Sequence, residues 1–269
     1  MRPSFTPRGY SQFFLGLPQN LLLQLRLVLT KLNALIPGIC VLCGTTGAHT
    51  ICPGCRTQFF GEIGLRCRCC ALPMSQMSVL PTNEKTTSIC RTCLHRPPAF
   101  DATIVACDYA APVDQLVLKL KFAGAIALAP LFADRIIEAL LHNAAADMPL
   151  PGCLTVVPLG RKRLQERGFN QSLEIAKPLA LALGVPLVPR MLARVRDTVA
   201  QSLLSSSERQ RNLVGAFTLL PQTIACVRGA HIGVVDDVMT TGETLNEIAA
   251  TLKFFGAARV TNLVFARTV

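Results

Sequence analysis

Short apolar runs alternate with longer amphipathic stretches from Phe100 to the end of the chain. The short runs predict strands, because unbroken β-branched and aliphatic residues are typical of strands buried on both faces. They are Thr103–Asp108, Leu154–Pro158, His231–Val235 and Arg259–Ala266, with a weaker run at Val185–Val188. The longer stretches predict helices at Val113–Phe122, Leu128–His142, Gln171–Leu183 and Thr244–Phe255. This alternation predicts an α/β fold with a doubly wound, mainly parallel sheet.

The last predicted helix has the clearest pattern. Leu245, Ile248, Leu252 and Phe255 recur at near-helical spacing, and Gly256 follows where a helix C-cap belongs. At the other end of the chain, residues 20–36 predict an amphipathic helix, and no run reaches the length of a membrane span. No secretory signal is recognisable, so the sequence predicts a cytoplasmic protein without a membrane span.

Eight of the 12 cysteines form four Cys-x-x-Cys pairs. The pairs are Cys40/Cys43, Cys52/Cys55, Cys67/Cys70 and Cys90/Cys93. Each pair can present two thiolates from a tight turn, which predicts two structural zinc sites with four thiolates each. We expect sequential pairing, first with second and third with fourth, while a cross-braced arrangement stays open. Cys69 or His95 could replace a neighbouring ligand.

The net charge of +11 is concentrated in the front of the chain. Residues 1–99 carry 10 Lys and Arg against 2 Asp and Glu. Such a basic region favours nucleic acid or a membrane surface as a partner. Zinc-bound thiolates would offset part of this charge, so the formal value overstates the basic field.

The segment HIGVVDDVMTTGET, residues 231–244, combines an apolar strand, two acids and a hydroxyl-rich turn before a helix. Backbone N–H groups at the start of a helix suit a phosphate dianion. Asp236 and Asp237 would repel that phosphate unless they serve another group, such as a ribose diol or a magnesium ion. The order of these features therefore predicts a ribose-phosphate site. The alternative is a strand that ends in solvated acids before a capped helix.

Two basic stretches extend this prediction to pyrophosphate. Arg161, Lys162, Arg163 and Arg167 follow the strand at Leu154–Pro158 and could contact pyrophosphate, or could begin a solvent-facing helix. A second stretch is basic, bears hydroxyls and lacks strand character, so it could form a loop that closes over the ligand or an ordinary surface loop. Its residues are Arg194, Arg196, Thr198, Gln201, Arg209, Arg211 and Asn212.

Residues 231–244 resemble the phosphoribosyl-pyrophosphate motif of type I phosphoribosyltransferases. This resemblance implies that Asp236 and Asp237 hold the ribose 2′ and 3′ hydroxyls. It also implies a 5′-phosphate site formed by the side chains and backbone of the following residues. These residues are Val238, Met239, Thr240, Thr241, Gly242, Glu243 and Thr244.

Three patterns together are similar to the ComF family, from about Ile36 to Val269. They are PLGRKRLQERGFNQS, RVRDTVAQSLLSSSERQRNLVGAF and VVDDVMTTGET. The resemblance implies an N-terminal amphipathic extension (1–36), a double zinc ribbon (37–98) and a phosphoribosyltransferase-like domain (99–269). It adds Lys121, Gln201, Arg209 and Arg211 as substrate-binding candidates. One departure is Gln210, where the family usually carries a basic residue.

Two functions are open. The first is transfer of a phosphoribosyl group from phosphoribosyl pyrophosphate and Mg²⁺ to an unidentified nitrogen acceptor, with Asp236, Asp237 and Arg167 in the catalytic site. The second is a competence-type factor for DNA uptake that binds single-stranded DNA and a ribose 5-phosphate nucleotide without turnover, with other competence proteins as partners. The chain stops just past its last predicted strand, so we expect no C-terminal hood over the acceptor. Any acceptor pocket would come from residues around Tyr109–Gly124 or from the cysteine region.

Overall fold

The computed structural model describes residues 38–61, 64–74, 88–144, 148–195 and 215–269. The chain divides between Pro53 and Gly54 into two compact units. The predicted helix at residues 20–36 lies outside the described residues. Gln201, Arg209 and Arg211 also lie outside them.

In the first unit, two very short strands form a hairpin. β1 (Gly38–Ile39) pairs antiparallel with β2 (Thr46–Gly47). The turn between them is closed by Cys40, whose N–H donates to the Thr45 carbonyl and whose carbonyl accepts from the Gly44 N–H, both at 2.9 Å. Gly44 has φ +76°, a conformation that favours glycine. This turn presents Cys40 and Cys43 on the same side.

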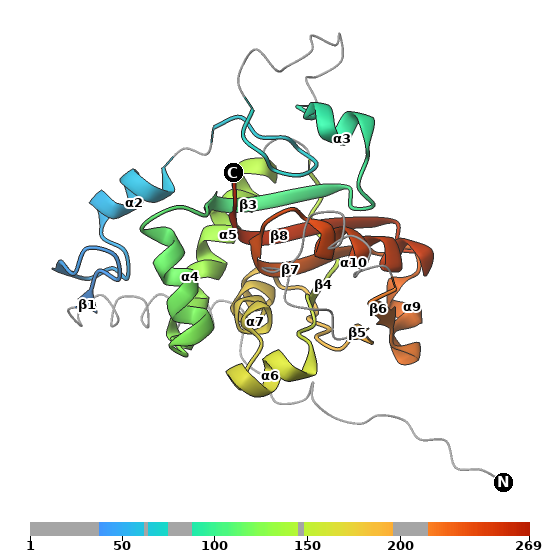
Figure 1. Cartoon of the computed structure of the whole chain (residues 1–269). Coiled ribbons are helices and arrows are strands. Elements are labelled where there is room, and N and C mark those ends of the chain that lie inside the picture. Colours follow the sequence, from blue (N-terminus) through green and yellow to red (C-terminus); the bar gives the residue numbers. More distant parts are fainter. Residues whose placement is uncertain (1–37, 62–63, 75–87, 145–147, 196–214) are drawn as a thin grey trace, which may run out of the picture. The chain divides into compact units, whose positions relative to one another are not determined.

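The second unit is built on a four-stranded sheet in the order β3-β8-β7-β4 (Figure 1). Its strands are β3 (Ala102–Asp108), β4 (Cys153–Val156), β7 (His231–Met239) and β8 (Arg259–Arg267). All three pairings are parallel. The weaker run at Val185–Val188 forms only an isolated parallel bridge, from Leu187 to Leu154 of β4. The predicted α/β fold with a mainly parallel sheet is confirmed.

The helices cover both faces of this sheet. α4 (Val113–Phe122) and α7 (Gln171–Leu183) have the predicted bounds, whereas α5 (Ala129–Ala144) and α10 (Glu243–Phe254) differ by one or two residues at their ends. α5 and α7 pack against each other and against one face (Figure 1). On that face Phe132 of α5 stacks on Phe265 of β8 with ring centroids 3.6 Å apart. The sequence pattern therefore determined these elements almost completely.

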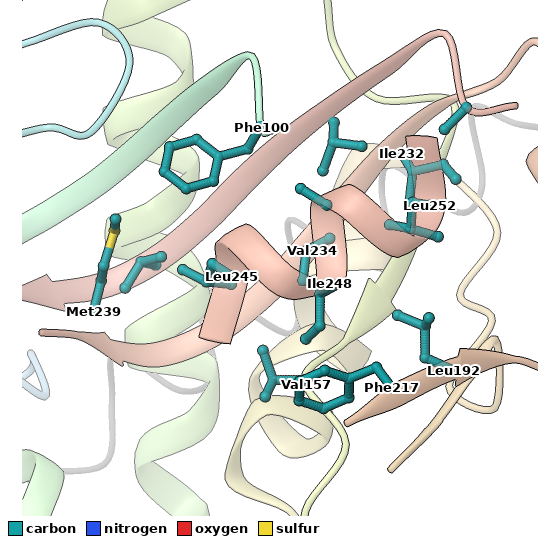
Figure 2. Close-up of a cluster of buried hydrophobic side chains, with 14 of the residues drawn as sticks. Phe100, Val157, Leu192, Phe217, Ile232, Val234, Met239, Leu245, Ile248 and Leu252 are labelled. Atoms are coloured by element: carbon teal, nitrogen blue, oxygen red, sulfur yellow. The ribbon is translucent and has the colours of Figure 1, made fainter. Parts of the chain in front are cut away.

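α10 covers the opposite face and contributes to the main hydrophobic cluster (Figure 2). Leu245, Ile248 and Leu252 project from one side of α10 toward Ile232 and Val234 of β7. All five side chains are at most 1% exposed. Burial of an aliphatic side chain of this size contributes about 1.5–3 kcal/mol, so this helix face anchors α10 to the sheet.

The remaining elements are short, and one of them differs from the sequence prediction. They are α2 (Pro53–Phe60), α3 (Arg91–His95), η2 (Ile126–Leu128), α6 (Arg161–Arg167), β5 (Leu192–Arg194), β6 (Phe217–Leu219), η4 (Pro221–Thr223) and α9 (Ile224–Val227). Arg194, predicted to begin a loop without strand character, instead ends β5, which pairs antiparallel with β6. The reason is that Leu192 and Phe217 are both 4% exposed and join the cluster under α10.

Within the described residues, no helix has both the length and the apolar character needed to cross a membrane.

Candidate ribose-phosphate site and cysteine centres

The strands β3, β7 and β4 all end at one edge of the parallel sheet. Ligands of open α/β sheets bind at this carboxyl edge, because several loops with free backbone groups meet there. Here the edge brings together the β7–α10 loop and residues from the segments that follow β3 and β4, which include α4 and α6. The site predicted from residues 231–244 is therefore flanked by two other segments.

The loop between β7 and α10 turns at Gly242, which has φ +85°. A Cβ atom at this position would lie 2.4 Å from Cε of Met239. Thr240 and Thr241 before it are exposed, and α10 begins directly after it at Glu243. The first N–H groups of a helix have no intrahelical acceptor, so this turn points donors outward where an anion can bind.

Arg267, at the end of β8, forms hydrogen bonds with the backbone of the β7–α10 loop. Its Nη1 donates to the Met239 carbonyl at 3.2 Å and to the Thr240 carbonyl, and its side chain is only 4% exposed. Arg267 is not among the site residues predicted from the sequence. An arginine that ends an otherwise apolar strand is the signal that could have found it.

The two acids at the end of β7 face different partners. Asp236 Oδ1 accepts from Ser172 Oγ at 2.9 Å and from the Asp237 N–H at 3.0 Å. Asp237 Oδ2 lies 2.8 Å from Lys121 Nζ, and Asp237 Oδ1 accepts from the Val238 N–H at 2.9 Å. Burial and the neighbouring Asp237 carboxylate raise the pKa of Asp236 to about 7. The acid pair is thus held rigidly and only partly neutralised.

Arg167, at the end of α6, connects the site to α4 and α7. Its Nη1 donates to Gln171 Oε1 at 3.1 Å, and its guanidinium lies 5.1 Å from the centre of the Phe122 ring. Burial lowers the pKa of Arg167, while the Asp237 carboxylate opposes that shift. Gln171 is 2% exposed, and its Nε2 has no hydrogen-bond partner among the described residues. A buried amide donor of this kind is available to a ligand.

A cavity of about 270 Å³ lies at this edge and is lined by residues from all these segments. Most sequence-predicted candidates line it: Lys121, Arg163, Arg167, Asp236, Asp237, Val238, Met239, Thr240, Thr241, Gly242, Glu243 and Thr244. Four further polar residues line it: Tyr109, from the range expected to form an acceptor pocket, Arg194, from the second basic stretch, and Gln171 and Ser172, which were not singled out from the sequence. Gln171 and Ser172 belong to the RGFNQS pattern, so their proximity to that pattern was the available signal.

Two of the predicted cations lie elsewhere. Arg161 and Lys162 occupy the first turn of α6, are exposed and are not among the residues that line the cavity. Of the second basic stretch, only its first residue, Arg194, is both described and part of the lining. Its guanidinium lies 5.7 Å from the centre of the Phe217 ring of β6.

The cysteines form two four-residue centres. Cys40, Cys43, Cys52 and Cys55 are one group, and Cys67, Cys70, Cys90 and Cys93 are the other. Within each group the sulfur atoms all lie within 4.8 Å of one another. The grouping follows the order of the pairs along the chain, as sequential pairing predicts. Each set of four sulfurs can hold one zinc ion in tetrahedral geometry.

Hydrogen bonds to sulfur lower the pKa of one cysteine in each centre, whereas the hydrogen bond with Cys67 raises the pKa of Cys70 and burial raises the pKa of Cys93. Although burial alone would raise it, backbone N–H groups including that of Cys52 lower the pKa of Cys40 to about 6. The side-chain hydrogen bond with Cys70, assisted by backbone N–H groups, lowers the pKa of Cys67 to about 4. By contrast, burial raises the pKa of Cys69 to about 11, and Cys69 belongs to neither group. The eight predicted cysteines therefore fit two zinc ions.

The family model described as a phosphoribosyl transferase domain matches residues 170–268 of this chain. These residues include the acid pair, the β7–α10 loop and β8. The parallel sheet, the acid pair with its hydroxyl-rich loop and this match define an α/β domain of the phosphoribosyltransferase type, in a chain that also carries two four-cysteine centres.

Comparison with curated proteins is more specific. The chain is 37% identical to the DNA utilization protein YhgH of Salmonella typhi, over 87% of this chain and 99% of that protein. It is 31% identical to competence protein F of Haemophilus influenzae, over 64% of this chain and 75% of that protein. The chain belongs to the ComF family. Among solved structures, the allosteric regulatory enzyme of purine biosynthesis matches 51% of this chain and 25% of its own, with 20% identity and a TM-score of 0.32.

Proposed function

We propose that this protein binds phosphoribosyl pyrophosphate and transfers its phosphoribosyl group to a nitrogen nucleophile. The observation that carries the proposal is the cavity in which an acid pair, a phosphate-type loop and four cationic side chains converge. The acid pair suits a ribose diol, the phosphate-type loop suits a phosphate, and the cationic side chains suit a pyrophosphate. The cavity volume of about 270 Å³ is close to the lower end of the range for small-molecule sites.

Each part of the ligand has a matching part of the site. The 5′-phosphate would accept hydrogen bonds from the backbone and hydroxyls of residues 240–244. Asp236 and Asp237 would accept hydrogen bonds from the ribose 2′ and 3′ hydroxyls, displacing Lys121 from its present ion pair toward the pyrophosphate. Gln171 Nε2, buried and unpartnered among the described residues, would donate to an oxygen of the ligand.

In the proposed transfer, the bond from ribose C1 to pyrophosphate breaks and a bond from C1 to the acceptor nitrogen forms, with loss of a proton from that nitrogen. Negative charge grows on the leaving pyrophosphate while C1 becomes positive. Arg163, Arg167 and Lys121 would stabilise the first charge, and the two carboxylates the second. Catalysis would rest on positioning rather than on a nucleophilic side chain.

Mg²⁺ belongs to this proposal as the partner of the pyrophosphate. Carboxylate oxygens are hard ligands suited to Mg²⁺, and Asp236 and Asp237 supply them at the edge of the cavity. A bound Mg²⁺ would neutralise charge on the leaving group. The thiolates of the two cysteine centres need a reducing compartment, so the proposal places the protein in the cytoplasm.

The experiment that tests ligand binding replaces both acids, Asp236→Asn together with Asp237→Asn. Calorimetric titration with phosphoribosyl pyrophosphate and Mg²⁺ should show binding to the parent protein and none to the double variant. Circular dichroism should show that both proteins are folded. Equal binding by both would contradict the assignment of the acids to the ribose.

A second candidate function is binding of single-stranded DNA, and one relative of this chain is named a DNA utilization protein. A neighbouring cavity of about 520 Å³ favours it, because it adds aromatic side chains to the same cations. Its lining includes Phe122, Phe169, Lys121, Arg163 and Arg167, and Phe122 is 71% exposed. Exposed aromatic rings among cations are the features on which unpaired bases stack.

The two functions separate in one pair of assays. Incubation with phosphoribosyl pyrophosphate, Mg²⁺ and candidate acceptors should release pyrophosphate if the protein is a transferase. Salt-dependent binding of an oligonucleotide without pyrophosphate release would favour the DNA-binding function. Phe122→Ala should then weaken oligonucleotide binding, while the matched exposed control Phe254→Ala should leave it unchanged, since Phe254 is 84% exposed on α10 and lines neither cavity.

A further inference from the structure

The first turn of α7 is fixed to two other segments that line the cavity. Asn170, the N-cap residue, accepts from the Ser172 N–H at 3.0 Å, and its Nδ2 donates to the carbonyl of Val157, just after β4, at 3.0 Å. Ser172 Oγ donates to Asp236 Oδ1 at 2.9 Å. A capped turn with these two attachments holds the residue between them, Gln171, in one position relative to the acid pair.

The orientation of the Gln171 amide follows from the chemistry of its partner. A guanidinium only donates hydrogen bonds, so the amide atom that lies 3.1 Å from Arg167 Nη1 is the oxygen Oε1. The other branch of the amide is therefore the nitrogen Nε2, which has no hydrogen-bond partner among the described residues. Gln171 is 2% exposed and lines the cavity. A buried donor without an acceptor is costly, and an acceptor on a bound ligand would remove that cost.

Gln171 lies between two groups to which the proposed function gives different roles. Its amide oxygen contacts Arg167, assigned to the pyrophosphate, and its chain neighbour Ser172 contacts Asp236, assigned to the ribose diol. In phosphoribosyl pyrophosphate, the atoms between these two parts are ribose C1 and the oxygen that joins it to the pyrophosphate. That oxygen is a hydrogen-bond acceptor, and it is the only one that both parts of the ligand share.

We propose that Gln171 Nε2 donates a hydrogen bond to the oxygen that joins ribose C1 to the pyrophosphate. Gln171 is then a catalytic residue for the proposed transfer, on which this inference rests. When the bond from C1 to this oxygen breaks, its electron pair goes to the oxygen and pyrophosphate leaves as the anion. A donor already held at that position stabilises the growing charge without reorganisation and without transferring a proton.

The first experiment measures affinity for phosphoribosyl pyrophosphate and for ribose 5-phosphate by calorimetry in the presence of Mg²⁺. Gln171→Met keeps the length of the side chain and removes the donor. It should weaken binding of phosphoribosyl pyrophosphate by about tenfold, as expected for loss of one hydrogen bond to a charged group. Affinity for ribose 5-phosphate should change by less than about threefold, since its C1 hydroxyl is uncharged. The matched control Gln115→Met, exposed on α4 and absent from the lining of both cavities, should change neither affinity.

Arg167→Met separates contact with the ligand from support of Arg167. If Gln171 acted only by holding Arg167, then Gln171→Met would have no further effect once Arg167 is replaced. We expect the tenfold loss of affinity for phosphoribosyl pyrophosphate to persist in the double variant. No further loss in the double variant would overturn the inference, as would an equal loss for both ligands.

Release of pyrophosphate provides the second experiment. With an acceptor that the parent protein uses, Gln171→Met should slow release at saturating phosphoribosyl pyrophosphate by about 100-fold, a typical effect of removing one donor to a developing negative charge. An unchanged rate would overturn the catalytic role. A parent protein that gives the expected binding pattern but releases no pyrophosphate would support the contact and contradict the proposed transfer. A parent protein that binds neither ligand would contradict both.

Discussion

The carboxyl group of Asp236 lies in surroundings that lower the stability of the fold when the group is ionised. Its carboxylate is half-buried beside a second carboxylate, and the ion pair that Lys121 forms at this site is with Asp237. These conditions oppose ionisation and raise its pKa from 3.8 to about 7. Residues kept at such a cost are usually functional, and a ligand with hydroxyls or a metal ion would relieve the repulsion.

We expect Asp236→Asn to stabilise the protein above pH 7 and to have little effect near pH 4. Between these values the folded protein holds a proton that the unfolded chain releases, so parent stability falls as the pH rises from about 4 to 7. Asn cannot ionise and keeps an acceptor for Ser172. The gain at pH 8 should be on the order of 1–3 kcal/mol in urea denaturation. A loss of stability at pH 8 would contradict the raised pKa.

The same group should control the pH dependence of ligand binding. If ionised Asp236 accepts from the ribose or holds Mg²⁺, affinity for phosphoribosyl pyrophosphate should rise as the pH passes through about 7. Titrations between pH 6 and 8.5 in the parent protein and in Asp236→Asn provide the measurement. The variant should bind weakly at every pH. A parent affinity that does not change across this range would argue against a role for the ionised form.

At the scale of the element, the functional unit is the β7–loop–α10 segment. β7 is apolar along most of its length because it is an interior strand, and its acids lie near its carboxyl end, two residues before Met239, where the sheet opens to the cavity. α10 is held by its buried face and begins immediately after a left-handed glycine. The loop is therefore anchored at both ends, which is what a preformed anion site requires.

We expect Gly242→Ala to weaken phosphate binding by at least tenfold and to cost about 1–3 kcal/mol of stability, because a non-glycine residue at φ +85° is strained. The new Cβ also requires the tip of Met239 to move. Gly229→Ala is a suitable control, since Gly229 has φ +68° and open space around its Cα, away from the cavity. It should lose stability but keep its affinity for ribose 5-phosphate. Equal affinities in both variants would contradict the loop assignment.

At the scale of the whole molecule, the cysteine centres supply stability that their short segments lack. β1 and β2 have two residues each, and α3 has five, so these parts bury little apolar surface of their own. Metal ligation by four sulfurs can replace a hydrophobic core in such segments. The second centre also adds its cysteines to the main hydrophobic cluster.

Elemental analysis of the purified protein should find about two zinc ions per chain, one for each four-cysteine group. Treatment with a strong chelator should lower the melting temperature, and added zinc should restore it. The variants Cys43→Ser and Cys90→Ser should each retain about one zinc ion. One ion or none in the parent protein would contradict the assignment of two centres.

The sequence by itself determined much of this protein. Alternating apolar and amphipathic stretches were enough to predict the four sheet strands and four main helices, because parallel strands buried on both faces leave a continuous apolar pattern. The Cys-x-x-Cys spacing predicted the cysteine centres, and the order of acids, hydroxyls and helix start in residues 231–244 predicted the phosphate-type site. Both predictions were possible because each pattern lies within a short stretch of the sequence.

Tertiary structure alone decided which distant residues join these sites. Ser172 meets Asp236, Lys121 meets Asp237, and Arg267 reaches under the loop, because parallel strands bring their carboxyl ends to one edge regardless of sequence separation. The β5–β6 hairpin likewise depends on partners more than twenty residues apart. The motif at residues 231–244 predicted a phosphate-type site, but only packing placed Arg267, from the end of β8, in contact with the backbone of that loop.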